Sequence, residues 1–388
     1  MSYTVLARRY RSQSFDQLVG QTAISETLKA AIEQHRVAHA YLFTGTRGVG
    51  KTSTARIFAN ALNNPEGKPD ITKAIMEGRD TDTIEIDAAS NSGVDGAREL
   101  IANASYLPLR GRRKIYIIDE VHMLTTGAFN ALLKTMEEPP EHVVFILCTT
   151  ETYKVPATIQ SRCQRFEFHN IKATKIAEHL TEVLKLENRK ATPDVVSAVA
   201  RLAGGSMRDS LSLLDRLLAT GKDPLTMDIL QDLLGLPEQA LINTLVDAIS
   251  AADASAALRI SSDLLSRSAS SDALMTALAE RFRDLMVISA CGERTDLVDA
   301  SGDQRAVLIA QATKFDPAGL VHNIALCDAV GRSVKMSSFP RALMDAMIVR
   351  LAMAEKLADV TAIVAQASTV SATALQTGAP KAINAKKQ

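Results

Sequence analysis

The 388-residue sequence contains no tryptophan, and aromatic residues make up only 4% of it, although hydrophobic residues reach 46%. Alanine, leucine, isoleucine and methionine are abundant instead. Strands of β-sandwiches are rich in aromatic and β-branched residues, so this composition favours helices packed on helices over a sandwich. A single hydrophobic core stops growing at roughly 250–300 residues. We therefore expect a mostly helical chain with two or three domains.

Cysteine is also scarce. The four cysteines, Cys148, Cys163, Cys291 and Cys327, lie far apart and form no C-x-x-C pair. This spacing argues against a disulfide framework or a zinc cage and fits reduced thiols inside a cell. No apolar signal segment follows the charged N-terminus, and no continuously apolar run reaches the ~18 residues of a membrane span. We expect a soluble cytoplasmic protein without membrane contact.

An excess of charge of one sign is absent, because 44 lysines and arginines balance 44 aspartates and glutamates. A protein that coats nucleic acid through bulk charge needs a field of one sign, and so does an acidic tail protein. The balance excludes both classes. Any contact with DNA must then come from local patches of basic residues.

Short apolar runs alternate with helix-length segments in the first part of the chain. Continuous runs of this kind predict buried parallel strands, and here they lie at residues 40–44, 83–88, 114–120 and 143–150. The pattern predicts a doubly wound α/β domain over residues 1–170.

From Ala173 onward apolar residues recur at helical spacing. We expect a small helical domain over residues 171–236 and a third, all-helical domain over residues 237–365. Residues 340–359 are apolar around most of a helix, which predicts a place inside a bundle or against a neighbouring subunit. Residues 366–388 are weakly hydrophobic and are expected to form a disordered tail.

A phosphate-binding motif follows directly on the first predicted strand. The sequence GTRGVGKT matches G-x-x-x-x-G-K-[ST] and precedes a helical segment that starts at Ser53. Glycines let backbone N–H groups surround phosphates, the lysine reaches the terminal phosphates, and the threonine hydroxyl binds Mg²⁺. The predicted ATP-binding residues are Gly45, Thr46, Arg47, Gly48, Val49, Gly50, Lys51, Thr52 and Ser53.

Two adjacent carboxylates end the third predicted strand, in the sequence KIYIIDE. Beside a phosphate-binding loop, Asp119 is expected to hold Mg²⁺ together with Thr52, and Glu120 to polarise the attacking water. Without that loop, a strand ending in Asp-Glu would equally be the start of a solvated turn. The pair predicts hydrolysis of ATP rather than binding alone, with Lys51, Asp119 and Glu120 as catalytic residues.

Several longer tracts together resemble one family. They are SYTVLARRYRSQSFDQLVGQ, HAYLFTGTRGVGKTSTAR, EIDAASNSGVDGARE, IYIIDEVHMLTTGAFNALLKTMEEPPEHVVFILCTTE and IQSRCQRFEF. This series is similar to the tau/gamma subunits of the bacterial DNA polymerase III clamp loader, which are AAA+ ATPases. The match is specific from Ser2 to about residue 220 and looser to about Lys356.

The resemblance implies further site residues. Thr150 falls at the family's sensor 1 position, and Arg208 looks like the sensor 2 arginine, carried on a helical lid. Arg162, in Ser-Arg-Cys, matches an arginine that reaches into the ATP site of the adjacent subunit. A planar cation there neutralises charge that develops in the transition state. Taken singly, Arg162 and Arg208 would also pass for ordinary surface arginines.

The resemblance also implies contacts with adenine and with DNA. Ala7, Arg8 and Arg11 lie in a tract like the one that wraps adenine, although such arginines also form plain solvated faces. Arg98 falls in a segment like those that follow duplex phosphates, where contacts position a protein without reading sequence. An exposed basic cluster, Arg110–Lys114, is either a DNA patch or a loop that is basic for solubility.

The sequence departs from the family in length. Full-length tau continues into regions that contact the helicase and the polymerase, so a chain ending at Gln388 is gamma-like, and those contacts are not expected from it. The resemblance implies a motor that opens and loads the sliding clamp onto primer-template DNA. Its implied partners are the delta and delta-prime subunits and further copies of itself.

Two other functions fit the sequence less well. A branch-migration ring would need an aromatic pore loop or a winged domain, and the sequence shows neither feature. A catalytically silent scaffold would need degraded motifs, whereas both the phosphate-binding motif and Asp119-Glu120 are intact.

A second departure generates a prediction. The family commonly carries a four-cysteine zinc module before the second strand, but residues 60–87 contain no cysteine or histidine. The usual soft ligands of zinc are therefore missing there. We expect metal analysis of the purified protein to find no tightly bound zinc. One zinc per chain would contradict this expectation.

Overall fold

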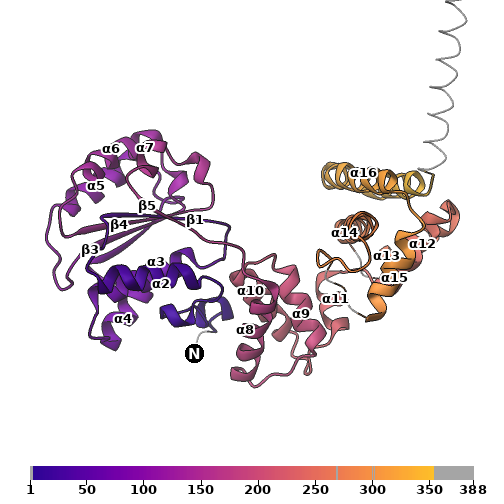
Figure 1. Cartoon of the computed structure of the whole chain (residues 1–388), viewed down its shortest axis with the longest axis horizontal. Helices are drawn as coiled ribbons and strands as arrows, with labels where there is room; N and C mark the ends of the chain where they lie inside the picture. The colour runs from indigo at the N-terminus through magenta and orange to yellow at the C-terminus, as the bar shows by residue number, and fades with distance from the viewer. Residues whose placement is uncertain (1–2, 268–269, 299, 301, 354–388) are drawn as a thin grey trace, which may run out of the picture. The chain divides into compact units, whose positions relative to one another are not determined.

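The computed structural model describes residues 3–267, 270–298, 300 and 302–353. The chain divides after Met227 into two compact units, called unit 1 and unit 2 below (Figure 1). The predicted tail, residues 366–388, lies outside the described residues. The three predicted domain ranges stay a prediction. Among the described residues no helix is long and apolar enough to cross a membrane.

Unit 1 is built on a parallel sheet of five strands in the order β2-β3-β4-β1-β5. The strands are β1 (Ala40–Thr44), β2 (Thr83–Asp87), β3 (Lys114–Asp119), β4 (Val143–Thr149) and β5 (Gln164–Glu167). The first four coincide with the four apolar runs. The edge strand β5 was not predicted, because only Phe166 of its four residues is buried. The expected α/β first part followed by helical parts is confirmed.

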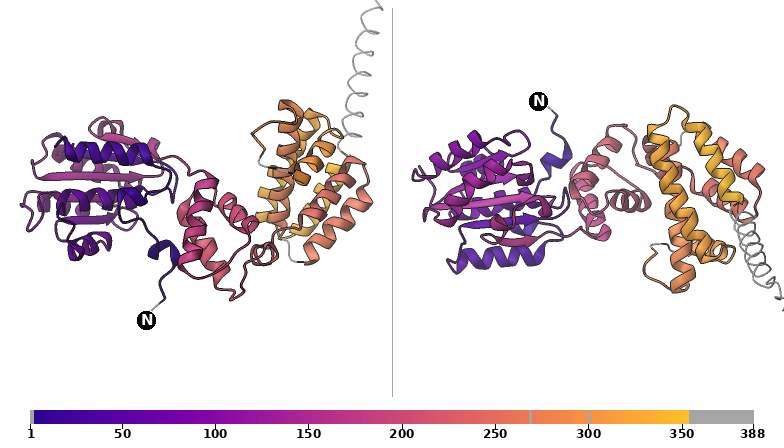
Figure 2. Two further views of the ribbon diagram at one scale, coloured as in Figure 1. Left: turned by 60° about the horizontal axis from the view of Figure 1, so that its bottom comes forward. Right: turned by 90° about the horizontal axis from the view of Figure 1, so that it is seen from above.

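Helices cover both faces of this sheet, which explains why the strands β1, β3 and β4 are almost wholly buried. In Figure 1 the helices α2, α3 and α4 lie on one face and α5, α6 and α7 on the other, and Figure 2 turns the same layers toward the reader. Side chains alternate along β1, so that Tyr41 and Phe43 pack on the first face and Ala40 and Leu42 on the second.

The remaining elements of unit 1 are short. Its α-helices and 3-10 helices are α1 (Leu6–Arg9), η1 (Phe15–Gln17), α2 (Thr22–Glu33), α3 (Lys51–Asn63), α4 (Pro69–Met76), α5 (Val94–Ala104), η2 (Val121–Met123), α6 (Thr126–Glu137), η3 (Thr152–Lys154), α7 (Ala157–Gln160), α8 (Ala173–Leu186), α9 (Pro193–Leu202) and α10 (Met207–Leu218). The helices α8, α9 and α10 pack on one another after the sheet ends, and we call them the lid.

The segment where the family places its zinc module folds around an asparagine and a helix. Asn64 accepts a hydrogen bond from the Lys68 N–H at 2.9 Å and donates to the Lys68 carbonyl and the Thr72 hydroxyl, both at 2.9 Å. Ile75 of α4 is buried in the core beneath the sheet. Side-chain hydrogen bonds and apolar packing thus shape this segment.

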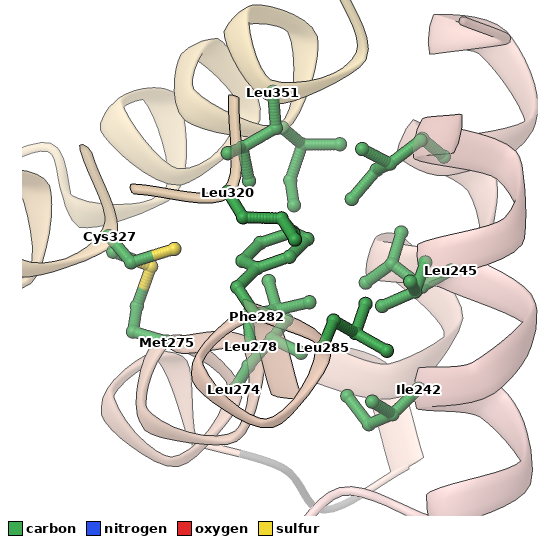
Figure 3. Close-up of a cluster of buried hydrophobic side chains, with 14 of the residues drawn as sticks. Ile242, Leu245, Leu274, Met275, Leu278, Phe282, Leu285, Leu320, Cys327 and Leu351 are labelled. Carbon is green, nitrogen blue, oxygen red and sulfur yellow. The ribbon is translucent and has the colours of Figure 1, made fainter. Parts of the chain in front are cut away.

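The described part of unit 2 is built from helices. They are α11 (Met227–Leu234), whose first residue is the last of unit 1, α12 (Gln239–Ser250), α13 (Ala254–Arg267), α14 (Ser271–Cys291), α15 (Gly302–Ala312) and α16 (Pro317–Met336), and residues 340–353 are also helical. Phe282 of α14 lies at the centre of the core, with Leu245, Leu320 and Leu351 around it (Figure 3). Residues 340–359 were predicted to lie inside a bundle or against a neighbouring subunit. Of these, residues 340–353 are described, and they bury Ile348 and Leu351 in this core, whereas residues 354–359 lie outside the described residues.

A buried aspartate shapes the loop between α5 and β3. The carboxylate of Asp82 accepts hydrogen bonds from the backbone N–H groups of Leu109, Arg110 and Gly111, each at 2.7 Å. Burial by itself raises the pKa of Asp82, but the amide bonds from Gly111, Leu109 and Arg110 together lower it below its usual value.

The basic cluster before β3 is only partly a surface feature. Lys114 is 9% exposed, and its ammonium group donates to the Asn103 carbonyl at 2.7 Å. Arg110 forms an ion pair with the buried carboxylate of Asp80. The sequence suggested four exposed basic residues here, Arg110, Arg112, Arg113 and Lys114, and this is wrong for Lys114, because the first residue of a central strand lies inside the sheet layers.

The Asp82 contacts predict an effect on stability. Asp82→Asn replaces one accepting oxygen by an NH₂ group that faces amide donors, so unfolding should become easier by about 2 kcal/mol at pH 7. The lowered pKa means that this stabilisation is present above the ordinary carboxyl pKa and is lost as pH falls through the lowered one. The gap between variant and wild type in urea unfolding should therefore shrink on acidification.

A matched control is Asp16→Asn, which removes a carboxylate that is 83% exposed and paired with Lys29. Exposed pairs contribute about 0–1 kcal/mol, so this change should cost little at any pH. An Asp82→Asn protein as stable as wild type at pH 7 would contradict the role of the three amide bonds.

Candidate active site

The strand order brings the predicted motifs to one edge of the sheet. Thr44 of β1 pairs with Thr149 of β4, and Ile118 of β3 pairs with Leu147 of β4. The carboxyl ends of β1, β3 and β4 therefore lie side by side. In open α/β sheets this edge is where ligands bind.

One cavity at this edge collects most of the residues that the sequence predicted. Its lining includes Ala7, Arg11, Arg47, Gly48, Val49, Gly50, Lys51, Thr52, Ser53, Asp119, Glu120 and Arg208. These residues come from the N-terminal segment, the loop after β1, the end of β3 and the start of α10. Four stretches of sequence far apart in the chain thus meet around one space.

Lysine 51 lies over the phosphate-binding loop. It is 6% exposed, and its ammonium group donates to the carbonyls of Gly45 at 2.8 Å and Thr46 at 2.7 Å. Burial lowers the pKa of Lys51, while Cys148, Glu120 and Asp119 oppose that shift. The loop thereby holds a positive charge beside the first N–H groups of α3, where a helix attracts anions.

Two oxygen-bearing side chains converge beside this lysine. The Thr52 hydroxyl donates to Asp119 Oδ2 at 2.7 Å, and the Glu120 N–H donates to Asp119 Oδ1 at 3.0 Å. A hydroxyl and a carboxylate at this distance fit a divalent cation that takes its other ligands from water and phosphates. Among the described residues no cluster of three or more acidic, histidine or cysteine side chains could hold a metal without such outside ligands.

Glutamate 120 is held by the neighbouring strand. Its carboxylate accepts a hydrogen bond from the Thr150 hydroxyl at 3.1 Å, so two of the predicted site residues are in contact. The backbone of Glu120 has φ +47°, a left-handed conformation that non-glycine residues adopt rarely and that clusters at functional sites. This turn aims the side chain away from the axis of β3.

The lid approaches the loop closely. Gly48 accepts backbone hydrogen bonds from Met207 at 3.1 Å and Arg208 at 3.4 Å, both in the first turn of α10. Gly48 has φ +78°, and a Cβ atom there would lie 2.0 Å from the Ser206 hydroxyl oxygen. Only glycine allows this approach, which places Arg208 at the cavity.

The N-terminal segment is attached to the lid. Glu187, just after α8, accepts hydrogen bonds from Arg9 and from the Tyr10 hydroxyl, both at 2.5 Å, and Tyr3 donates to Asp215. The bond from Tyr10, followed by that from Arg9, lowers the pKa of Glu187. Arg9 is thus ion-paired rather than part of a free basic face.

Some predicted residues lie elsewhere. Arg8 is exposed, and Thr46 donates to Asn170 at 2.6 Å; neither lines the cavity. Arg162 also lies outside it, where it binds Glu137 Oε1 and the Thr158 carbonyl at 2.5 and 2.6 Å. Arg98 is on the exposed surface of α5, 3.4 Å from Asp95.

Sequence reasoning missed the apolar and aromatic part of the lining. Tyr10, Leu18, Ile171, His179 and Leu211 all face the cavity. Burial lowers the pKa of His179, against the opposing effect of Glu182. These residues belong to no local motif, because single positions in α8 and α10 and in the connections after α1, η1 and β5 supply them. Of these five residues, Tyr10 and Leu18 lay within a tract that had been noticed in the sequence.

Three family models match the chain in succession. They are described as DNA polymerase III, delta subunit, over residues 20–172; DNA polymerase III clamp loader subunit, ATPase lid domain, over residues 175–223; and DNA polymerase III subunits gamma and tau domain III, over residues 225–367. The chain belongs to the DNA polymerase III tau/gamma family. The resemblance inferred from the sequence tracts is confirmed.

Curated relatives agree with this assignment. The tau/gamma subunit of Haemophilus influenzae is 48% identical over 61% of this chain and 35% of its own length, and the tau subunit of Bacillus subtilis is 42% identical over 74% of this chain and 52% of its own length. The gamma subunit of Buchnera aphidicola is 40% identical over 62% of this chain and 68% of its own length. The chain thus spans about a third to a half of the first two relatives.

The contact between loop and lid predicts a specific loss. Gly48→Ala should push Ser206 and the start of α10 away from the cavity, because the new Cβ atom overlaps the Ser206 hydroxyl. The clash and the backbone strain together cost a few kcal/mol in the arrangement that binds nucleotide. The affinity for an ATP analogue should therefore fall by about tenfold or more. Titration of a fluorescent ATP analogue measures this.

Gly204→Ala is the matched control. Gly204 also has a positive φ, +56°, but a Cβ atom there would meet nothing within 4 Å. Both variants carry backbone strain, and only Gly48→Ala carries the clash. Equal affinities of the two variants for the analogue would show that the approach of the lid does not matter for binding.

Proposed function

We propose that this chain is an ATP-hydrolysing motor subunit of a bacterial clamp loader. The observation that carries the proposal is the meeting of Lys51, Thr52, Asp119, Glu120 and Arg208 at one cavity. Membership of the tau/gamma family supplies the process, which is loading of the sliding clamp during DNA replication. The proposed ligands are ATP and Mg²⁺, and no zinc.

The cavity offers each part of a nucleotide a suitable surface. The loop after β1 and the start of α3 present N–H groups and the Lys51 charge to phosphates. Thr52 and Asp119 would hold Mg²⁺, which when bound neutralises charge on the phosphate oxygens. Tyr10, Ile171 and Leu211 supply apolar surface for a base, beside Ala7 and Arg11.

Different residues of the chain are proposed to activate water and to stabilise negative charge during hydrolysis. Glu120 is the group that orients water and accepts its proton, and the Thr150 hydroxyl holds that carboxylate at 3.1 Å. Lys51 and Arg208 stabilise negative charge from the loop and from the lid. Because Arg208 is on the lid, bound nucleotide would tie the lid to the sheet and favour one of two conformations.

Arg162 is proposed to act on a neighbouring subunit. It lies outside its own cavity, and its guanidinium is exposed enough to leave Glu137, since the side chain is 32% accessible. A subunit that lends this arginine to the next site couples hydrolysis to assembly. The proposed partners are further copies of this chain, delta and delta-prime subunits, the sliding clamp and primer-template DNA.

DNA contact is proposed at Arg98. The side chain of Arg98 is 71% exposed, and its partner Asp95 is 97% exposed, so a phosphate can compete for the guanidinium at low cost. Because the net charge of the chain is zero, the affinity of one subunit for DNA should be weak and should fall as salt concentration rises. Several subunits acting together would be needed to hold DNA.

The test is the ATPase rate of an assembly reconstituted with partner subunits, clamp and primed DNA. Wild type should be stimulated by clamp plus DNA. Arg162→Ala should leave ATP binding intact and lower stimulated hydrolysis by about a thousandfold, the usual scale of an arginine supplied in trans. Lys51→Ala, the control for loss of binding, should bind no ATP.

Two results would contradict separate parts of the proposal. Hydrolysis at the wild-type rate by an Arg162→Ala assembly would exclude Arg162 as the residue supplied in trans. Absence of stimulation by clamp and DNA in a complete wild-type assembly would count against clamp loading, even if ATP were hydrolysed.

A further inference from the structure

A buried histidine stands beside the acidic end of β3. His122 lies in η2, and its side chain is 6% exposed. Its Nδ1 is 3.1 Å from the Thr149 hydroxyl and 3.5 Å from Glu120 Oε2, and its Nε2 is 3.3 Å from Glu151 Oε1. Both ring nitrogens therefore face oxygen atoms, and the ring spans the distance between two carboxylates.

These carboxylates belong to different parts of the site. Glu120 follows β3 and faces the cavity, whereas Glu151 follows β4 and begins the segment that leads to Arg162. Glu120 Oε2 is the same oxygen that accepts the hydrogen bond from Thr150. Its position therefore depends on two groups that act on one atom, the Thr150 hydroxyl and the His122 ring.

The segment from Glu151 to Arg162 is held together by its own hydrogen bonds. The Gln160 side chain donates to the Thr152 carbonyl at 3.1 Å and to the Val155 carbonyl at 2.8 Å. These bonds tie α7 to η3, and the Arg162 N–H then donates to the Ile159 carbonyl at 3.1 Å. Because these hydrogen bonds leave the segment little internal freedom, a displacement of Glu151 at one end also displaces Arg162 at the other end.

We propose that His122 is a positioning residue that ties the Glu120 carboxylate to Glu151, and through Glu151 to the segment that carries Arg162. This inference rests on the proposed function. Engagement of Arg162 with a neighbouring subunit would shift its segment, and His122 would pass the shift to the water-orienting carboxylate of the same chain. Each subunit would then hydrolyse fastest when its own arginine is in use.

A purely structural histidine would behave differently. Its removal would lower stability and leave the turnover number for ATP unaffected in the protein that still folds. A positioning residue changes kcat at nearly constant KM, because binding of ATP depends on other groups. Removal of a polar group that holds a functional residue in place typically lowers activity by about 10–100-fold.

The experiment compares steady-state ATP hydrolysis of complete assemblies with clamp and primed DNA. His122→Ala should lower kcat by about tenfold or more while KM for ATP changes by less than about twofold. His122→Asn, which can place an amide near the Nδ1 position, should recover a large part of the rate. Glu151→Gln should also lower kcat, and the double variant His122→Ala/Glu151→Gln should lose no more than His122→Ala alone.

His142→Ala is the matched control. His142 also bonds through its ring, with Nε2 near the carbonyls of Ala104 and Tyr106 at 3.1 and 3.0 Å, but it does not line the cavity. His142→Ala should change the melting temperature rather than kcat.

Two outcomes would overturn the inference. They are a wild-type kcat in His122→Ala and additive losses of kcat in the double variant. If His122→Ala does not fold, the His122→Asn and Glu151→Gln assemblies decide, and wild-type kcat in both would overturn it.

The outcomes separate this inference from the proposed function. A wild-type assembly that hydrolyses ATP with stimulation, alongside a His122→Ala assembly that matches it, overturns the role of His122 alone. A wild-type assembly that hydrolyses no ATP overturns the proposed function and this inference with it.

Discussion

The parallel register of β1, β3 and β4 is the constraint on which the site depends. Parallel strands end at the same edge, so residues that follow each strand are brought together however far apart they lie in sequence. The bond from Thr52 to Asp119, at 2.7 Å, joins the helix after β1 to the end of β3. A slip of β3 by one residue would move its whole set of side chains to the opposite face and separate this pair.

The lid gives the site its second half. Its contact with the sheet domain is made by backbone groups at Gly48 and by the ion pair and hydrogen bonds of Glu187 with the N-terminal segment. Backbone contacts of this kind require close approach, and a glycine without Cβ permits it. The residues proposed to surround the base and the phosphates therefore belong to two bodies that nucleotide would hold together.

Prediction from sequence succeeded where a local pattern carries the physics. Four of the five strands followed from short, mainly apolar runs, because a strand covered on both faces has few polar positions. The edge strand β5 was missed because the residues on either side of Phe166 are exposed. Lys114 was also misjudged, because its charge suggested a place on the surface. It is the first residue of a central strand, so its aliphatic stem is buried and its ammonium group donates to the Asn103 carbonyl.

The glycine-rich motif after β1, the adjacent carboxylates and the family could be predicted from the sequence, because glycine spacing and charge at the end of an apolar run express their chemistry locally. The contacts across the fold could not be predicted: Arg162 binds Glu137 outside its own cavity, Tyr10 and His179 line that cavity, and His122 spans Glu120 and Glu151. Those contacts join residues on separate elements, and no spacing along the chain encodes the distance between two elements that meet only after folding.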